Sequence, residues 1–451
     1  MTHDEPCTGC RRARRYRDAG RRGRAVPADA EAEGVITRIQ ARNYKCLKDV
    51  DVRLSPFQVL VGPNSSGKST FMDVLGFIRD MLQYREGVDA AVTTRGKWLN
   101  QLTWNSEGGE IEFAVTLRMP DGLRARAAED HSHCRYCVAI HQNTGVSGAV
   151  LAWEGVWTLE DPGIPAADAG GGSPRAAVAS PSADLYPPSA RGTSNHLTRR
   201  GDKGEYARLD DQIPIVPFKI HPAVPLLTRV PDDALVLAWA RDMLMEETTH
   251  VVLDPARMRE PCPPNTPDVL AADGSNLAKV VQTLKDRDPG RFEWWLAHLR
   301  TVLGELEAIR VVEQQQDRRL YIEVLRKDGA PVPAWLMSDG ALRFVGLTLL
   351  AYMPDNDSVY LVEEPETGIH PSAIESVYHS LGSIYDGQVL VATHSPLMVG
   401  LAEPEQLLCF SRTESGETRI VRGHEHPLMR NWQKSVSLGS LYASGIFDGA
   451  E

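Results

Sequence analysis

The chain has 451 residues, enough for roughly two or three domains, and its 42% hydrophobic content is normal for a globular protein with a substantial core. It contains no run of about 18 apolar residues, and its basic N-terminus lacks the apolar segment of a secretory signal. We therefore expect a cytoplasmic protein without a membrane partner. The net charge of −11 argues against a uniformly basic nucleic-acid-binding body but leaves room for a local basic surface, so DNA stays a possible partner.

Seven cysteines are spread over the chain, an odd number that does not suggest a disulfide framework. Cys7 and Cys10 could form a zinc site with Cys134 and Cys137, because both pairs have the spacing of metal ligands. The second pair could instead recruit a nearby histidine, namely His131, His133 or His141. The sequence favours cysteines without a metal, because the first pair lies in a segment without apolar periodicity and both pairs lack knuckle glycines.

Residues 1–34 are predicted to be a disordered tail. They include eight arginines between Arg11 and Arg24, followed by a stretch rich in Ala, Asp and Glu. A solvated tail or an over-extended start site is the favoured interpretation, and an arginine-rich arm for a nucleic acid or a partner is the alternative.

The next segment has the pattern of a strand, a loop and a helix. Strands are predicted at Ile36–Ile39 and Gln58–Val61, and a helix from Lys68 to about Tyr84. Alternating apolar residues predict further strands at Glu110–Leu117 and Ala149–Leu159. Residues 161–190, rich in Pro, Gly, Ala and Ser, are predicted to be a low-complexity insertion.

Regular structure is predicted to resume after this insertion, with helices at Ala234–Met245, Ser275–Lys285 and Arg291–Leu303 and strands at Ile309–Val312 and Leu320–Leu325. The last part alternates helix and strand over Ala341–Met353, Val359–Val362, Pro371–Tyr385 and Val389–Thr393, which is typical of a parallel α/β sheet. We therefore expect an α/β fold with a mixed sheet flanked by helices. It would be assembled from residues 35–118 and 331–451, with 119–330 as an inserted α+β lobe.

A phosphate-binding loop is predicted between the second strand and the first helix. Residues 62–70 read GPNSSGKST and fit GxxxxGK[ST] in the strand-and-helix context that this motif requires. Lys68 is expected to reach the β- and γ-phosphates, and Ser69 to offer its hydroxyl to Mg²⁺. The predicted nucleotide contacts are Asn64, Ser65, Ser66, Gly67, Lys68, Ser69 and Thr70.

Two adjacent carboxylates end the apolar strand at Val359–Val362, as in a Walker B element. Glu363, at a position more often filled by Asp, is expected to hold Mg²⁺ directly or through water. Glu364 is expected to orient and deprotonate the attacking water, so the predicted reaction is ATP + H₂O → ADP + phosphate. A pair of surface acids at a helix start is the alternative.

His394 follows the strand Val389–Thr393, at the edge where α/β proteins bind ligands. We expect it to sense the γ-phosphate rather than to act as a packing or capping histidine. Ser338 and Gly340 precede an apolar helix shortly before the paired acids. Taken alone, the segment 337–344 would be a helix N-cap.

In this order the motifs GPNSSGKST, SDGALRF, VEEPETGIHP and THSP resemble those of AAA-family ATPases of the ABC/SMC/RecF/OLD-like group. The resemblance implies that Ser338 and Gly340 belong to a signature loop that contacts the γ-phosphate bound by a second subunit. It further implies an ATP-sandwiched head-to-head homodimer or higher oligomer in a bacterial cytosol. Such proteins act in DNA repair or in antiphage defence beside a nuclease or toxin.

Two departures from the group are expected. The segment after His394 is too short for the Toprim nuclease domain of OLD proteins, and the long coiled coil of SMC proteins is missing. Weaker candidates are Gln101, which could reach Mg²⁺ as a Q-loop glutamine, and Arg257 and Arg259, which could face phosphate or DNA. The alternative for all three is an ordinary exposed polar residue.

The main functional hypothesis is an ATP-switched sensor or regulator of a separate nuclease or toxin effector in antiphage defence. The alternative is a RecF-like DNA-binding ATPase in DNA repair or maintenance. A transporter subunit is disfavoured, because Lys68 and Ser338 lie farther apart than in a compact transporter ATPase.

Overall fold

The computed structural model describes residues 35–124, 131–143, 148–160, 193–200, 203–206, 218–219, 221–354, 357–427, 429, 432 and 436–445. The predicted tail 1–34 and the predicted insertion 161–190 lie outside this part of the chain. The chain divides into two compact units. Unit 1 comprises Met1–Leu54, Asp73–Glu247 and Gly416–Thr418, and unit 2 comprises Ser55–Met72, Thr248–Ser415 and Arg419–Glu451. These units divide the chain at places other than the predicted domain boundaries, which stay a prediction.

Unit 1 is built on an eight-stranded antiparallel sheet with strand order β2-β1-β4-β5-β6-β7-β8-β9. Almost every residue of β4 and β5 is buried, so apolar side chains cover both faces of the sheet there. The strands are β1 (Ile36–Tyr44), β2 (Leu47–Arg53), β4 (Ile111–Arg118), β5 (His133–Gln142), β6 (Ala149–Leu159), β7 (Thr193–Arg200), β8 (Lys203–Tyr206) and β9 (Phe218–Lys219). The helices are most of α2 (Lys68–Gln83), α3 (Val88–Thr93), α4 (Asp121–Arg124) and α5 (Leu235–Met245). The predictions of β1, β4, β6, α2 and α5 are confirmed, whereas the other strands of this sheet were not predicted.

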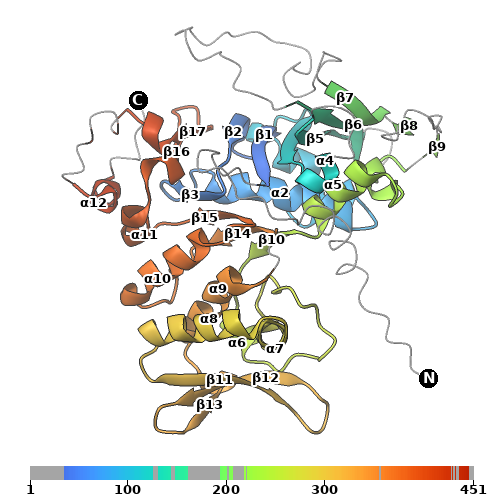
Figure 1. Cartoon of the computed structure of the whole chain (residues 1–451). Helices are drawn as coiled ribbons and strands as arrows, with labels where there is room; N and C mark the ends of the chain where they lie inside the picture. The colour runs from blue at the N-terminus through green and yellow to red at the C-terminus, as the bar shows by residue number, and fades with distance from the viewer. Residues whose placement is uncertain are drawn as a thin grey trace, which may run out of the picture. The chain divides into compact units, whose positions relative to one another are not determined.

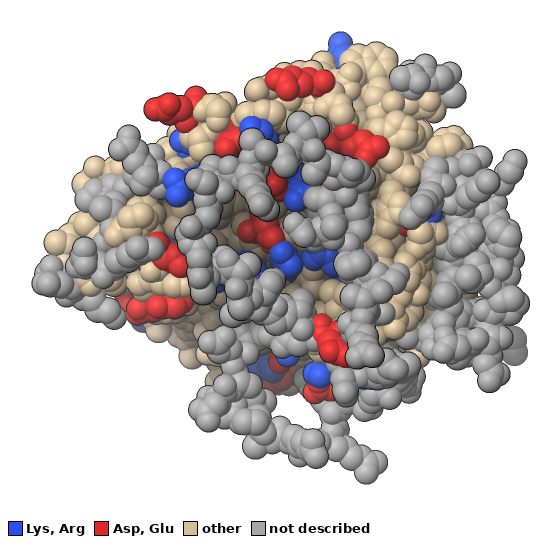
Figure 2. All heavy atoms as spheres, turned by 90° about the horizontal axis from the view of Figure 1, so that it is seen from above, with Lys and Arg blue, Asp and Glu red and all other residues tan. Residues whose placement is uncertain are grey.

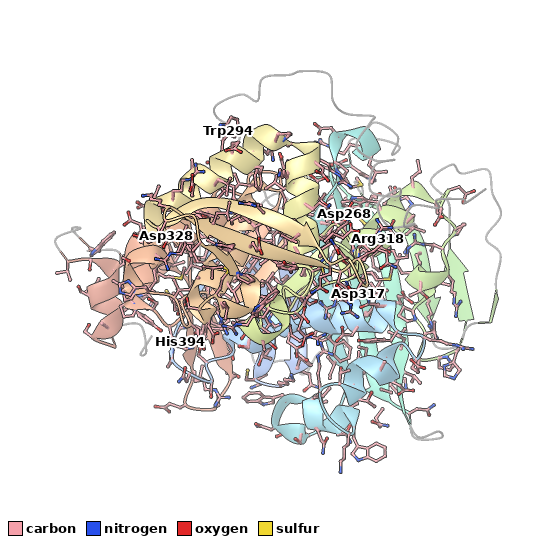
Figure 3. The ribbon with its side chains drawn as sticks, turned by 90° about the horizontal axis from the view of Figure 1, so that it is seen from below. Asp268, Trp294, Asp317, Arg318, Asp328 and His394 are labelled. Carbon is pink, nitrogen blue, oxygen red and sulfur yellow. The ribbon has the colours of Figure 1, made fainter. Side chains whose placement is uncertain are left out.

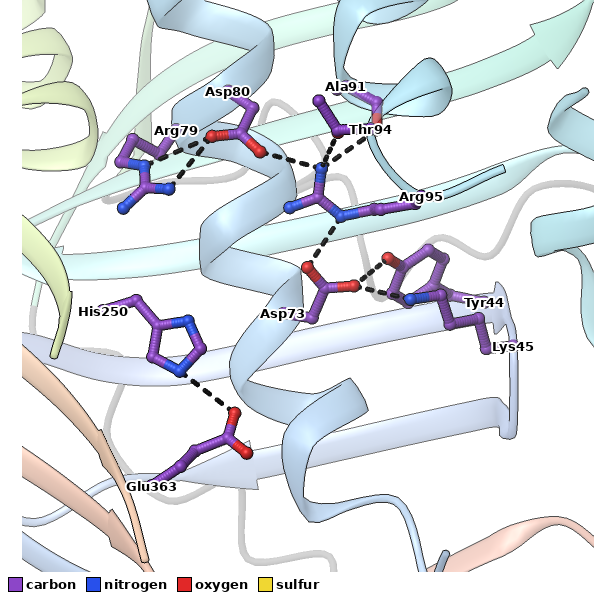
Figure 4. Close-up of polar contacts among 10 residues, drawn as sticks. All are labelled: Tyr44, Lys45, Asp73, Arg79, Asp80, Ala91, Thr94, Arg95, His250 and Glu363. Atoms are coloured by element: carbon purple, nitrogen blue, oxygen red, sulfur yellow. Dashed lines mark hydrogen bonds and ion pairs between the residues drawn. The ribbon is translucent and has the colours of Figure 1, made fainter. Parts of the chain in front are cut away.

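A network of ionised side chains lies between α2 and the β1–β2 turn (Figure 4). Asp73 accepts hydrogen bonds from Tyr44 Oη at 2.5 Å, Lys45 Nζ at 2.7 Å and Arg95 Nε at 2.7 Å. Arg95 also donates to Asp80 Oδ2 at 2.8 Å. Burial alone would raise the pKa of Asp73, but Arg95 and Lys45 outweigh burial and hold it below its usual value. Within this network each charge has a partner of opposite sign.

Unit 2 contains a six-stranded sheet with strand order β10-β14-β15-β3-β16-β17. The strands from β10 to β16 pair in parallel. Their bounds are β3 (Phe57–Val61), β10 (Thr248–Val251), β14 (Val359–Glu363), β15 (Gln388–Ala392), β16 (Leu407–Arg412) and β17 (Thr418–Arg422). The central strand β3 comes from the N-terminal part of the chain, while its neighbours β15 and β16 come from the C-terminal part. The predicted assembly of the parallel sheet from distant parts of the chain is therefore confirmed.

Helices separate this sheet from a second, antiparallel sheet in unit 2 (Figure 1). The unit 2 helices are α6 (Pro255–Met258), α7 (Leu277–Arg287), α8 (Pro289–Val302), α9 (Asp339–Leu349), α10 (Pro371–Gly382), α11 (Pro396–Leu401) and α12 (Leu438–Ala443), of which the last two lie outside the layer between the sheets. The second sheet consists of β11 (Leu306–Glu313), β12 (Leu320–Arg326) and β13 (Pro331–Pro333), and α7 and α8 pack on its first two strands. Figure 3 shows its turns at Asp317–Arg318 and at Asp328. Unit 2 thus has the order sheet, helices, sheet, and the predicted α/β class is confirmed.

Charged side chains of both signs are interspersed on the face shown in Figure 2, where the described Lys and Arg residues lie among Asp and Glu. The described residues of this face therefore form no surface of a single sign.

Among the helices that the structure describes, none combines the length and the apolar character needed to cross a bilayer.

Candidate functional site

The predicted phosphate-binding loop connects the buried strand β3 to helix α2. Gly62 has φ +145°, and a Cβ at this position would lie 2.1 Å from the carbonyl oxygen of Phe410, so only glycine fits. Lys68 is 5% exposed, and its Nζ donates to the carbonyl oxygens of Gly62 and Pro63 at 2.7 and 2.9 Å. The ammonium group is thus held over the loop by neutral acceptors, at the N-terminus of a helix whose free N–H groups favour an anion.

The first of the two predicted acids meets the loop directly. Ser69 Oγ donates to Glu363 Oε2 at 2.7 Å, which joins the start of α2 to the end of β14. His250 Nε2, on the neighbouring strand β10, lies 3.0 Å from Glu363 Oε1 at an ion-pair distance, without the geometry of a hydrogen bond (Figure 4). A hydroxyl and a carboxylate are oxygen ligands of the kind that Mg²⁺ prefers. The residues present therefore fit a magnesium ion.

The second acid, Glu364, is exposed and has a left-handed backbone with φ +43°. Such a conformation is costly for a residue with a side chain and is held by its surroundings. The Glu364 main-chain N–H donates to Ala392 O at 2.8 Å, and Thr367 Oγ1 donates to the Glu364 carboxylate at 3.2 Å. The position of this carboxylate is therefore fixed by a turn that is tied to the end of β15.

His394, labelled in Figure 3, is the second residue after β15, and it lies close enough to Lys68 and Glu364 to interact with both charges. Burial lowers its pKa below the usual value and the Lys68 ammonium lowers it further, against the opposing effect of Glu364 and Glu366. His394 is therefore neutral near pH 7, able to offer one N–H to an oxygen ligand. The structure brings Lys68, Ser69, Glu363, Glu364 and His394 together at the carboxyl ends of adjacent parallel strands.

Ser338 and Gly340 lie at the start of α9. Ser338 Oγ accepts a hydrogen bond from Ala341 N at 3.3 Å, so Ser338 is the N-cap of the helix. A Cβ on Gly340 would lie 2.3 Å from the carbonyl oxygen of Gly368, which belongs to the turn after Glu364. The predicted signature loop therefore packs against the turn that carries Glu364, and Ser338 remains exposed.

Family comparisons match both halves of this site. Residues 35–120 match the family "AAA ATPase domain", and residues 271–400 match "AAA domain, putative AbiEii toxin, Type IV TA system". The first range contains the phosphate-binding loop, and the second contains Ser338, Glu363, Glu364 and His394. Both segments that carry the site are therefore similar to ATPase domains of the AAA type.

Individual relatives of this chain match only short segments. The DNA replication and repair protein RecF of Corynebacterium jeikeium is 27% identical over 93 residues, which are 20% of this chain and 22% of that protein. The OLD nuclease of Thermus scotoductus is 36% identical over 44 residues, which are 10% of this chain and 8% of that nuclease. This chain thus spans less than a quarter of the length of either relative.

Solved structures similar to the AAA ATPase include a SmcHead bound to the C-winged helix domain of ScpA, with 14% identity and a TM-score of 0.49, covering 86% of this chain and 97% of that one. The SMC head domain from Thermotoga maritima has 12% identity and a TM-score of 0.41, covering 86% of this chain and 98% of that one.

Gln101, predicted as a metal ligand of the ATPase, lies in unit 1 in the short 3-10 helix Leu99–Leu102. Its Oε1 accepts a hydrogen bond from the Lys97 main-chain N–H at 2.8 Å. This contact holds the Gln101 side chain within a local turn. Its assignment as a Mg²⁺ ligand stays a prediction.

Cys134 and Cys137 are fully buried in β5. Three positions apart on a strand, their side chains point to opposite faces of the sheet, so they do not converge on one metal ion. Burial raises the pKa of both thiols, to about 11 for Cys137. Within the described residues no group of three or more His, Cys, Asp or Glu side chains is placed to hold a metal, and Cys7 and Cys10 lie outside that part of the chain.

Four residues beside the ATPase site carry contacts that the sequence did not predict. His250 meets Glu363, and Glu366 accepts hydrogen bonds from Thr393 and His394. Arg259 donates to Met337 O at 2.8 Å and to Asp339 Oδ1 at 2.5 Å, so it contacts the backbone before Ser338 and the side chain after it. The fourth residue is Tyr442.

Tyr442, on the C-terminal helix α12, donates from its Oη to Gly62 O at 3.2 Å. A Cβ on Gly439 of the same helix would lie 2.1 Å from Pro396 O, at the start of the helix after His394. Helix α12 therefore contacts both the phosphate-binding loop and the segment that follows His394. The motif VEEPETG contains Glu366 as a third acid, which could have pointed to this residue from the sequence. No sequence motif pointed to His250 or Tyr442.

Proposed function

We propose that this AAA ATPase binds Mg²⁺-ATP at the loop Gly62–Thr70 and hydrolyses it with Glu364 as the general base. The observation that carries the proposal is the hydrogen bond between Ser69 and Glu363, because it joins the predicted phosphate loop and the predicted acids in one place. Lys68 and His394 flank the same place. A hydrogen bond of purely structural use would not require the glycine-restricted loop beside it.

Lys68 supplies the positive charge for the β- and γ-phosphates. Two of its acceptors are main-chain carbonyls of its own loop, which are weaker partners than phosphate oxygens, so ATP displaces them. The N–H groups of the loop and of the first turn of α2 add hydrogen bonds to the phosphates. Binding therefore needs a change of partners at one side chain.

Ser69 and Glu363 would hold Mg²⁺, which when bound neutralises charge on the β- and γ-phosphate oxygens. Glu363 is itself held by Ser69 on one oxygen and faces His250 with the other. These contacts orient the carboxylate before the metal arrives.

Glu364 would accept a proton from the attacking water while the water oxygen forms its bond to the γ-phosphorus and the bond to the β-phosphate oxygen breaks. Thr367 restrains the carboxylate through a hydrogen bond to Oε2. His394, neutral near pH 7, would donate an N–H to a γ-phosphate oxygen. In this proposal Glu364 is the base and His394 is the separate hydrogen-bond donor that senses the γ-phosphate.

The experiment that tests this function is ATP turnover with Mg²⁺, measured for the wild type and for Glu364→Gln. The amide occupies the same space but accepts no proton from water, so turnover should fall by about two to four orders of magnitude. The matched control is Glu375→Gln, an exposed glutamate on α10 that approaches only His379 among the described side chains, at 3.8 Å. A wild type without turnover, or a Glu364→Gln enzyme as fast as wild type, contradicts the assignment.

We further propose that the cycle switches a homodimer that regulates a separate nuclease or toxin effector in antiphage defence. The match to a family described by an AbiEii toxin supports this, and the exposed Ser338 beside the Glu364 turn is suited to a second subunit's nucleotide. The match to RecF supports the alternative, a DNA-binding ATPase in repair or maintenance. Stimulation of ATP turnover by DNA in the isolated protein would favour the alternative, whereas a nuclease-like reading frame beside the gene would favour the regulator.

A further inference from the structure

Glu366 links the turn after β14 to the end of β15. Its Oε1 accepts a hydrogen bond from Thr393 Oγ1 at 2.6 Å and another from the His394 main-chain N–H at 3.0 Å. Thr393 is fully buried. One carboxylate oxygen of Glu366 therefore fixes the backbone at the point where His394 begins.

The same turn fixes Glu364. Its N–H is bonded to Ala392 O, and its O accepts from Thr367 N at 2.9 Å. With φ +43° at Glu364, the backbone leaves the strand direction immediately before Pro365 and Glu366. Two contacts thus connect the turn to β15, one through the main chain of Glu364 and one through the side chain of Glu366.

The charge of Glu366 has consequences as well as its hydrogen bonds. Its carboxylate opposes the lowering of the His394 pKa by burial and by Lys68. Its Oε2 is buried and has no hydrogen-bond partner among the described residues. A group placed only for packing would not leave a buried carboxylate oxygen without a partner, because that arrangement is costly.

We infer that Glu366 is a positioning residue that holds His394 and Glu364 in one fixed relation, so that the γ-phosphate donor and the base act on the same phosphate. The inference rests on the proposed ATP hydrolysis. The acceptor oxygen on Glu366, rather than its negative charge, supports His394. Glutamine, which keeps one acceptor oxygen, should therefore replace it better than alanine.

The test compares Glu366→Ala, Glu366→Gln and the control Glu375→Ala in steady-state ATP turnover. Glu366→Ala should lower kcat by about ten- to a hundredfold, since small displacements of reacting groups cost rate steeply, while KM for ATP changes by less than about threefold. Glu366→Gln should keep kcat within about threefold of wild type. Glu375→Ala should behave as wild type, because the Glu375 side chain is 71% exposed.

A second variant guards against misfolding. Thr393→Val removes one of the two donors to Glu366 and keeps the His394 N–H, so it should lower kcat by a smaller factor than Glu366→Ala; thermal unfolding of each variant shows that the proteins are folded. Unchanged kcat in Glu366→Ala, or equal losses in the alanine and glutamine variants, would overturn the inference. If the wild type turns over no ATP, the proposed function fails instead.

Discussion

Two polar regions of the molecule hold a largely buried cation in different ways, and Figure 4 shows the one around Arg95. In unit 1, Arg95 donates to two carboxylates, Asp73 and Asp80, at 2.7 and 2.8 Å. In unit 2, Lys68 donates to two neutral carbonyl oxygens of its own loop at 2.7 and 2.9 Å. The distances are alike, but the acceptors are not.

The difference in acceptors indicates that Arg95 stabilises the fold, whereas Lys68 is suited to bind an anion. A guanidinium between carboxylates already has the counter-charge that it needs, so an incoming anion gains little there. The bonds of the Lys68 ammonium to two carbonyl oxygens are weaker than bonds to phosphate oxygens, so a phosphate improves on them. Unit 1 should therefore respond to mutation in stability, and unit 2 in nucleotide binding.

The largest effect is expected for Lys68→Ala. Two charge-assisted hydrogen bonds to phosphate at about 1.5 to 3 kcal/mol each correspond to a loss of at least about a hundredfold in ATP affinity. Calorimetric titration with Mg²⁺-ATP measures it. The matched control is Lys279→Ala, since the Lys279 ammonium lies 3.8 Å from the Asp268 carboxylate and should leave ATP affinity unchanged. Near-wild-type affinity in Lys68→Ala would show that the comparison above is wrong.

Glu364→Gln should trap bound ATP and, with it, a dimer. If Ser338 and Gly340 close over the partner's nucleotide, each ATP bridges two subunits and no hydrolysis releases them. Light scattering should then show an ATP-dependent doubling of mass in Glu364→Gln. Adding Ser338→Arg places bulk and charge at the bridge and should return the protein to monomers that still bind ATP. A mass that responds neither to ATP nor to Ser338→Arg rejects the sandwich while leaving the ATPase assignment intact.

Asp73→Asn should act on stability. Replacing the carboxylate leaves Arg95 and Lys45 without their shared partner and should lower the free energy of unfolding by about 2 kcal/mol at pH 7. Since the folded pKa of Asp73 is lowered, its contribution is present above the unfolded value of about 3.9 and is lost as pH falls through the folded value. Denaturant unfolding of both proteins at pH 7 and near pH 3 should show a gap that shrinks in acid. A gap that is constant with pH would exclude the ionic explanation.

The smallest effect is expected for Cys134→Ser. A hydroxyl in place of a fully buried thiol should cost about 1 to 2 kcal/mol of stability, because it adds a polar group to an apolar site. ATP turnover per folded molecule and the zinc content of the purified protein should both match wild type. A stoichiometric metal that disappears in the variant would restore the zinc interpretation of the cysteine pairs.

The sequence predicted the parts of the site that depend on local spacing. The phosphate loop, the paired acids and His394 each follow an apolar strand, and parallel strands place their carboxyl ends together, so their meeting could be foreseen. The antiparallel sheet of unit 1 was largely missed because a strand such as β5 mixes buried polar and apolar side chains and shows no clear period. Contacts such as Glu366 with Thr393, 27 residues apart, depend on which side chains meet across strands, and no periodicity specifies that.

Helix α12 has a practical meaning for anyone who shortens this protein. A fragment designed from the motifs and the six-stranded sheet would end soon after β17, the last strand of that sheet. Such a fragment would remove Tyr442 from Gly62 O and uncover Pro396 where Gly439 packs. The phosphate-binding loop and the segment after His394 would each lose a contact with α12, although every motif residue would still be present. Residues 438–443 belong in any fragment meant to bind nucleotide, and a tag joined after them needs a spacer long enough to leave that helix in place.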